Sequence, residues 1–171
     1  MNQLFLCGIT DSGKSTTIKN AVIHYLPVTQ RIKNSYINNQ NPTKYFRILG
    51  KLVVVWLCSP QELENTPNEA RNNLKKKIES AEKRDAKLFI ISFNIDQEEK
   101  TDECLKYLSN VKKIVNSWFV YLPPHYNLSK ITHRKMSDIK NKGFNLLPTI
   151  NQKSIMDRAR IFSSYIMDFI K

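Results

Sequence analysis

Short apolar runs alternate along the chain with segments in which apolar residues recur at every third or fourth position. Leu4–Cys7, Leu52–Cys58 and Leu88–Phe93 are continuous apolar runs with the length of buried strands. A further strand is expected near Ile114–Leu122, where two prolines end it. Because strands that alternate with helices usually pair in parallel, the pattern predicts an α/β fold with a mostly parallel central sheet flanked by helices.

Helical spacing and capping residues mark the first two helices. One helix is predicted from Lys14 until a proline ends it, because its apolar residues recur at helical spacing: Ile18, Val22, Ile23 and Leu26. Thr66, followed by a proline and by Glu69, has the pattern of a capping box. This box predicts a second helix that runs to about Arg84.

Two further helices are expected toward the C-terminus. One is short and lies around Asp102–Asn110. The other is introduced by a capping box at Thr149–Gln152, and its inner face is expected to carry Ile155, Ala159, Phe162, Ile166 and Phe169. The length of the chain suits one hydrophobic core, so residues 1–171 are expected to form a single domain.

A β-hairpin is predicted after the first helix. Lys44–Leu49 and Leu52–Cys58 lie on either side of Gly50-Lys51, and a two-residue turn of glycine followed by a polar residue favours a hairpin. The pattern leaves open whether Gln30–Asn38 adds another edge strand.

The loop between the first strand and the first helix carries the spacing G-x-x-x-x-G-K-S, from Gly8 to Ser15. Glycines at these positions let successive backbone N–H groups converge on a phosphate. Lys14 is then expected to reach the β- and γ-phosphates and Ser15 to complete the shell of a Mg²⁺ ion. The strand before the loop and the helix after it are the context that this motif requires.

This constellation resembles the P-loop NTPase superfamily, and the stretch GITDSGKST is similar to the loop of its small nucleotide-kinase branch. The resemblance implies a P-loop NTPase fold with Mg²⁺ and ATP, or another nucleoside triphosphate, as cofactors. It also implies contacts to phosphate or metal from Gly8, Ile9, Thr10, Asp11, Ser12, Gly13, Lys14, Ser15 and Thr16. The guanine-recognition sequence N-K-x-D is absent, which disfavours a Ras-like GTPase.

The carboxylate that would join Ser15 at the metal is ambiguous, because no apolar run ends directly in aspartate. Asp96 follows Leu88–Phe93 after two residues, and Glu62 follows the preceding strand. We expect Asp96 as the catalytic and metal-side carboxylate, with Glu62 as the alternative metal ligand. Either residue could instead serve only as a loop or helix-start residue, and Asp11 is a third candidate.

In a mostly parallel sheet, ligands bind beyond the carboxyl ends of the strands. This rule predicts that the loops Gly8–Ser15, Ser59–Glu62, Asn94–Asp96 and Pro123–Tyr126 share one face. The basic segment from His125 to Lys142 follows the last of them. In nucleotide kinases a basic lid covers the phosphates, so the resemblance makes this segment a candidate lid and Arg134 a candidate catalytic residue. Alternatively, the segment is a basic helix that is permanently packed, or it docks to nucleic acid.

The composition limits the function classes. With 27 lysines and arginines against 15 aspartates and glutamates, the formal charge of +12 favours anionic partners, among them a nucleic acid or a phosphorylated substrate. The apolar runs are too short to span a membrane, and the N-terminal run is too short for a secretory signal. The three cysteines lack metal-ligand spacing and are expected to be reduced residues of a cytoplasmic protein.

Together these features predict a Mg²⁺-dependent protein that binds a nucleoside triphosphate, with ATP the expected nucleotide, and acts as an NTPase or a small kinase. The alternative is a nucleotide-dependent module that binds nucleic acid or protein with slow turnover or none.

Overall fold

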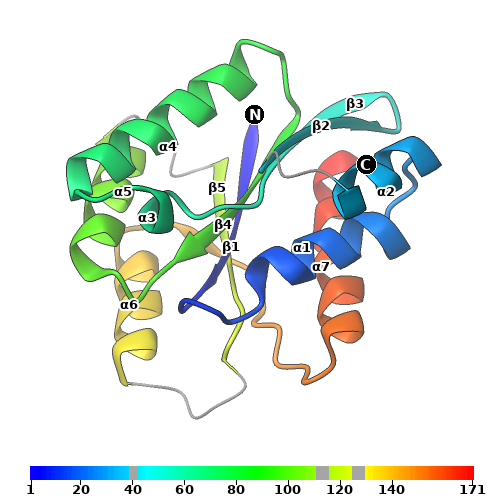
Figure 1. Cartoon of the computed structure of the whole chain (residues 1–171). Helices are drawn as coiled ribbons and strands as arrows, with labels where there is room; N and C mark the ends of the chain where they lie inside the picture. The colour runs from blue at the N-terminus through cyan, green and yellow to red at the C-terminus, as the bar shows by residue number, and fades with distance from the viewer. Residues whose placement is uncertain (39–41, 111–115, 125–129) are drawn as a thin grey trace.

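A single mixed sheet organises the computed structural model, which describes residues 1–38, 42–110, 116–124 and 130–171 (Figure 1). The strands run in the spatial order β2-β3-β4-β1-β5-β6, and β2 alone is antiparallel to its neighbour. Their bounds are β1 Asn2–Gly8, β2 Thr43–Ile48, β3 Lys51–Trp56, β4 Leu88–Asn94, β5 Ser117–Tyr121 and β6 Asn145–Leu146. The predicted α/β class with a mostly parallel sheet is confirmed.

Helices cover both faces of this sheet (Figure 1). On one face lie α1 (Lys14–Asn20), its π-helical continuation η1 (Ala21–Tyr25), α2 (Gln30–Asn38) and α7 (Ile155–Ile170). On the other face lie α4 (Pro67–Glu82), α5 (Glu98–Asn110) and α6 (Lys130–Asn141). The short α3 (Pro60–Leu63) connects β3 to α4.

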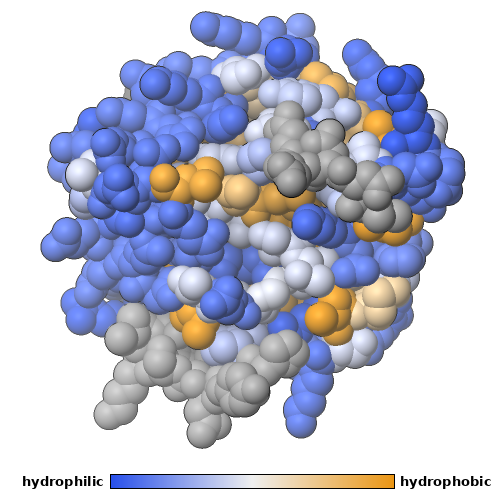
Figure 2. Space-filling view, viewed as in Figure 1, coloured by the Kyte–Doolittle hydropathy of each residue, from blue (hydrophilic) through white to orange (hydrophobic). Residues whose placement is uncertain are grey.

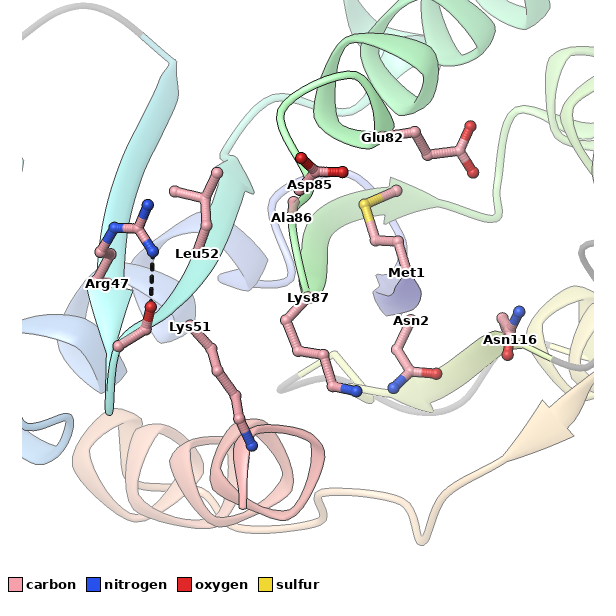
Figure 3. Close-up of a pocket in the computed structure, with 11 residues that line it drawn as sticks. Met1, Asn2, Arg47, Lys51, Leu52, Glu82, Asp85, Ala86, Lys87 and Asn116 are labelled. Carbon is pink, nitrogen blue, oxygen red and sulfur yellow. Dashed lines mark hydrogen bonds between the residues drawn. The ribbon is translucent and has the colours of Figure 1, made fainter.

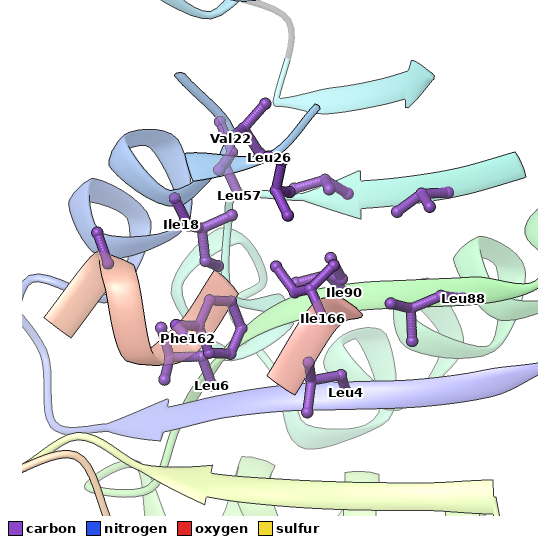
Figure 4. Packing of buried hydrophobic residues seen from close by; sticks show 14 of the residues in the cluster. Leu4, Leu6, Ile18, Val22, Leu26, Leu57, Leu88, Ile90, Phe162 and Ile166 are labelled. Atoms are coloured by element: carbon purple, nitrogen blue, oxygen red, sulfur yellow. The ribbon is translucent and has the colours of Figure 1, made fainter. Parts of the chain in front are cut away.

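Two hydrophobic cores result, one on each face of the sheet. In the first, Leu4 and Leu6 of β1 pack with residues of α1, η1 and α7, among them Ile18, Val22, Phe162 and Ile166 (Figure 4). In the second, Phe5 stacks on Phe119 with ring centroids 4.5 Å apart and meets Phe93 edge to face at 5.4 Å. Because β1 contributes alternate residues to both cores, it is fixed from both sides.

The first helix begins at Lys14, and its π-helical continuation ends at Tyr25, just before Pro27, as predicted; Leu26 is the extended C-cap between them. The hairpin is also present, but its turn lies one residue earlier than expected. Leu49 and Gly50 occupy the turn with φ of 50° and 78°, and Lys51 already pairs with Ile48. Positive φ at both central residues is the geometry that matches the twist of the two strands.

The segment Gln30–Asn38, which the sequence pattern left open, forms the helix α2 and adds no edge strand. Ile32 and Tyr36 lie four residues apart and both pack on the first core, as the same face of a helix requires. The edge position of the sheet belongs to β2 instead.

The predicted start of the last helix at Thr149–Gln152 is wrong. The helix α7 begins at Ile155, and Ser154 caps it by accepting a hydrogen bond from the Asp157 N–H at 3.4 Å. The preceding backbone runs along β5, where the Ile150 N–H donates to the Tyr121 carbonyl at 3.0 Å. Extended pairing excludes helical geometry there, and Ile155 is consequently exposed instead of buried in the core.

The surface of the face shown in Figure 2 is mainly hydrophilic, with small separate apolar patches. Within the described ranges, α4 and α7 are the longest helices at 16 residues each, and no helix there has the length and hydrophobicity needed to cross a membrane.

The position of the α7 cap can be tested by two alanine substitutions. We expect Ser154→Ala to lower the free energy of unfolding by about 0.5–2 kcal/mol, because the helix loses its side-chain cap. Thr149→Ala is expected to change this free energy by less than about 0.5 kcal/mol, since Thr149 is exposed and lies outside the helix. Urea denaturation of both variants measures the difference, and a larger loss from Thr149→Ala would place the cap where the sequence pattern had it.

Candidate functional site

The carboxyl ends of the parallel strands meet at one edge of the sheet. Gly8, the last residue of β1, is paired with Asn94, the last residue of β4. The Ile95 N–H donates to the Gly8 carbonyl at 3.1 Å, and the Leu122 N–H donates to the Cys7 carbonyl at 2.7 Å. The loops after β4 and β5 therefore begin on either side of the loop after β1.

The loop from Gly8 to Ser15 is a compact turn that leads directly into α1. Two of its residues, Asp11 and Gly13, adopt left-handed backbone conformations with φ of 59° and 84°. The Ser12 N–H donates to the Ile9 carbonyl at 3.2 Å and closes the turn.

Gly8 lies where no larger residue fits. A Cβ atom at this position would come within 2.3 Å of Ser12 Oγ and 2.9 Å of the Leu122 carbonyl oxygen. The first glycine of the motif is therefore required by close packing of the loop against the end of β5.

Lys14 is folded into this loop and is only 4% exposed. Its Nζ donates to the Ile9 carbonyl at 2.6 Å and to Ser12 Oγ at 3.4 Å. Burial lowers the pKa of Lys14 below its ordinary value, while nearby carboxylates, Glu62 first and then Asp96, oppose this shift. Within the described residues its hydrogen-bond partners are neutral oxygens, so no ion pair neutralises the ammonium charge.

Ser15, the next residue, is held by its hydroxyl group. Its Oγ donates to the Leu57 carbonyl at 2.6 Å, just beyond the end of β3. Because the hydroxyl hydrogen is used in this bond, the oxygen lone pairs are left to accept a hydrogen bond or to coordinate a cation.

A cavity of about 260 Å³ opens beside these residues. It brings together the second half of the loop, the exposed Thr16, a carboxylate from α3 and a serine of β4. The residues that line it are Asp11, Gly13, Lys14, Ser15, Thr16, Glu62 and Ser92.

The two predicted site carboxylates lie on different sides of this arrangement. Asp96 is exposed and accepts a hydrogen bond from the Thr10 N–H through Oδ2 at 2.9 Å, which fastens the loop from outside the cavity. Glu62 lines the cavity, and its Oε1 accepts a hydrogen bond from Asn94 Nδ2 at 2.7 Å. Of these two, Glu62 is therefore the carboxylate that shares the cavity with Lys14 and Ser15, and Asp11, the third candidate, lines the same cavity.

Asn94 joins three of the loops and was not among the predicted site residues. Besides Glu62, its Nδ2 contacts Thr10 Oγ1 at 3.2 Å, and its backbone N–H donates to Ser59 Oγ at 3.1 Å. Its Oδ1 is buried without a hydrogen-bond partner among the described residues. The signal in the sequence is an amide side chain at the end of an otherwise apolar strand.

Arg158 of α7 is a second residue that the sequence analysis missed. It is 2% exposed, and its guanidinium donates to three carbonyl oxygens: Gln152, Ser12 at 3.4 Å and Pro123 at 3.3 Å. It thereby links the loop of Gly8–Ser15 to the loop after β5. The signal was a charged residue four positions before the core residue Phe162, on the inner face of an amphipathic helix.

The basic segment after β5 is a helix where the structure describes it. Lys135 is 2% exposed and bonds both carboxylate oxygens of Asp102, at 2.9 and 3.0 Å, with Glu98 at 3.4 Å. Ile139 is fully buried, so this part of α6 is packed on α5 as the helical alternative predicted. Arg134 is exposed and its catalytic role stays a prediction; residues 125–129, part of the proposed lid, lie outside the described residues.

The cysteines do not form a site. Burial raises the pKa of Cys104 to about 12 and raises the pKa of Cys7 as well. All three thiols, including the half-buried Cys58, are free. Across the described part of the chain, no group of three or more histidine, cysteine or acidic side chains could hold a metal ion.

A larger cavity, of about 690 Å³, lies at the opposite edge of the sheet (Figure 3). Two of the cations that line it already have main-chain partners: Arg47 donates to the Gly50 carbonyl at 2.6 Å, and Lys51 donates to the Ile170 carbonyl at 2.5 Å. Because it lies at the amino ends of β1 and β4, away from the loops that follow the parallel strands, it is not the candidate site.

Comparisons with family models, with curated proteins and with solved structures found no match to this chain.

The close packing at Gly8 yields a testable consequence. We expect Gly8→Ala to lower the free energy of unfolding by about 1–3 kcal/mol, because the new methyl group overlaps Ser12 and the Leu122 carbonyl. The double variant Gly8→Ala/Ser12→Ala removes only the nearer contact and should recover part of the loss. Urea denaturation measures both, and full stability in Gly8→Ala alone would contradict the packing described above.

Proposed function

We propose that this protein binds a Mg²⁺-complexed nucleoside triphosphate, with ATP the expected nucleotide, and transfers or hydrolyses its terminal phosphoryl group. The observation that carries the proposal is the placement of Lys14. Its ammonium is buried in the loop, is bonded only to neutral oxygens among the described residues, and lines an open cavity. A P-loop NTPase fold fits the position of this loop between β1 and α1.

The residues around the cavity suit a chain of phosphates. Left-handed backbone at Asp11 and Gly13 allows successive N–H groups to converge, and α1 with its continuation begins directly at Lys14. Lys14 would exchange its bonds to Ile9 and Ser12 for phosphate oxygens and stabilise charge on the transferring group.

The donors also fit a magnesium ion beside those phosphates. Ser15 already donates its hydrogen to Leu57 and offers its lone pairs, and Glu62 supplies a carboxylate within the same cavity. Mg²⁺ bound there would neutralise charge on the β- and γ-phosphate oxygens. We place Glu62 ahead of Asp96 in this role, because Asp96 holds the Thr10 N–H outside the cavity.

Asn94 supports the proposed carboxylate. Its Nδ2 holds Glu62 from the end of β4, so the carboxylate is oriented before any ligand arrives. Water as the acceptor of the phosphoryl group would make the protein a hydrolase, and a small hydroxyl- or phosphate-bearing substrate would make it a kinase. The roles of Lys14, Ser15 and Glu62 are the same in both cases.

The binding of Mg·ATP tests the proposal through Lys14. We expect Lys14→Ala to weaken binding by about 10- to 100-fold, because the phosphates lose a charge-assisted hydrogen bond. Lys83→Ala, which removes an exposed lysine at the end of α4, should leave the affinity unchanged. Isothermal titration calorimetry compares the three proteins; equal affinities for wild type and Lys14→Ala, or no binding by either, would refute the proposal.

The choice of metal-side carboxylate has a separate test. In the wild type, Mg²⁺ should strengthen ATP binding, and Glu62→Gln should remove most of this gain, about tenfold in affinity, because a neutral amide is a poor Mg²⁺ ligand. Asp96→Asn keeps an acceptor for the Thr10 N–H and is expected to leave the gain intact. ATP titrations with Mg²⁺ and with EDTA measure this gain in affinity. A loss of the gain in Asp96→Asn, with the gain intact in Glu62→Gln, would assign the metal-side carboxylate to Asp96.

A further inference from the structure

Arg158 is the one described arginine that contacts the backbone of the Gly8–Ser15 loop. Its three hydrogen bonds all go to main-chain carbonyls, of Ser12, Pro123 and Gln152, which belong to three separate segments. A planar guanidinium can hold three such acceptors in fixed directions, which a lysine cannot do. The end of β5, the loop before α7 and the candidate phosphate-binding loop are therefore tied to one rigid group.

The bond to Ser12 acts on the peptide unit between Ser12 and Gly13. No peptide bond in the described chain is cis, so the Ser12 carbonyl and the Gly13 N–H point in opposite directions. When Arg158 holds the carbonyl toward α7, the Gly13 N–H is turned away from α7. Gly13 also lines the cavity that contains Lys14 and Ser15, and its left-handed φ of 84° is one that glycine adopts without strain, so the direction of its N–H depends on how the Ser12–Gly13 peptide is held.

The charge of Arg158 is also left without a carboxylate partner among the described residues. A guanidinium used only to anchor a helix is commonly paired with an acid, since a buried cation without one is costly. Carbonyl oxygens satisfy its N–H groups here while its positive charge persists close to the loop.

We propose that Arg158 is a positioning residue for the triphosphate: it fixes the Ser12–Gly13 peptide so that the Gly13 N–H meets a phosphate oxygen. The inference rests on the proposed function, because it concerns the same loop. The inference goes beyond the proposed function because it assigns the C-terminal helix a role in recognising the phosphates and no role in recognising the base.

The test compares Arg158→Met and Arg158→Lys with Arg160→Met, which removes an arginine from the exposed face of the same helix. Inorganic tripolyphosphate and Mg·ATP are titrated by calorimetry at a temperature where every variant is folded. We expect Arg158→Met to weaken both ligands by the same factor, about tenfold, and Arg160→Met to change neither. Arg158→Lys keeps the charge but loses the fork and is expected to be as weak as Arg158→Met.

Wild-type affinity in Arg158→Lys would overturn the positioning role, because charge alone would then suffice. A loss of ATP affinity without loss of tripolyphosphate affinity would also overturn it. If the wild type bound neither ligand, the proposed function would fail and with it the phosphate contact of Gly13. The remaining part of the inference, that Arg158 fixes the Ser12–Gly13 peptide, would then be decided in the free protein by the backbone amide NMR signal of Gly13. Arg158→Lys should shift that signal and Arg160→Met should not; an unshifted signal would refute the inference.

Discussion

The arrangement of the candidate site depends on the parallel pairing of β1 with both β4 and β5. This pairing sets the last residue of β1, Gly8, beside Asn94 and delivers the following loops to the same edge. The two hydrophobic cores hold β1 in register, because its alternate residues are buried on opposite faces. A shift by one residue would exchange those faces and separate the loops. Side chains that lie more than 80 residues apart, such as Thr10 and Asn94, can therefore be in hydrogen-bond contact.

How much of this the sequence could predict follows from the range of each interaction. The strands and the first helix were predictable because apolar periodicity and Pro27 act locally. The common edge of the loops was predictable because parallel strands place their carboxyl ends at the same edge of a sheet. The start of α7 was not predictable, since pairing of Ile150 with β5 overrides a local capping pattern. Nor could the sequence rank Glu62 against Asp96: both follow strand ends, and only the three-dimensional path of α3 carries one of them into the cavity.

The strong positive charge of the chain has more than one structural use. Lys135 is buried against Asp102 and Glu98 and joins α6 to α5, while Lys77 and Arg84 lie over the rings of Trp56 and Tyr45 at 5.4 and 4.8 Å. These cations stabilise packing and do not by themselves indicate a polynucleotide. Binding to nucleic acid stays a prediction from net charge, and binding of a smaller anion in the cavity beside Lys14 stays a proposal that rests on the residues lining it.

Lys14 and Arg158 differ from those cations in being buried where their bonded partners are neutral oxygens. Desolvation of each disfavours its charged form, and burial correspondingly lowers the pKa of both. A fold optimised only for stability would gain by pairing them with acids or by replacing them with apolar residues. Their presence beside the Gly8–Ser15 loop supports the proposed anionic ligand on physical grounds, because a bound anion would restore the electrostatic energy that burial removes.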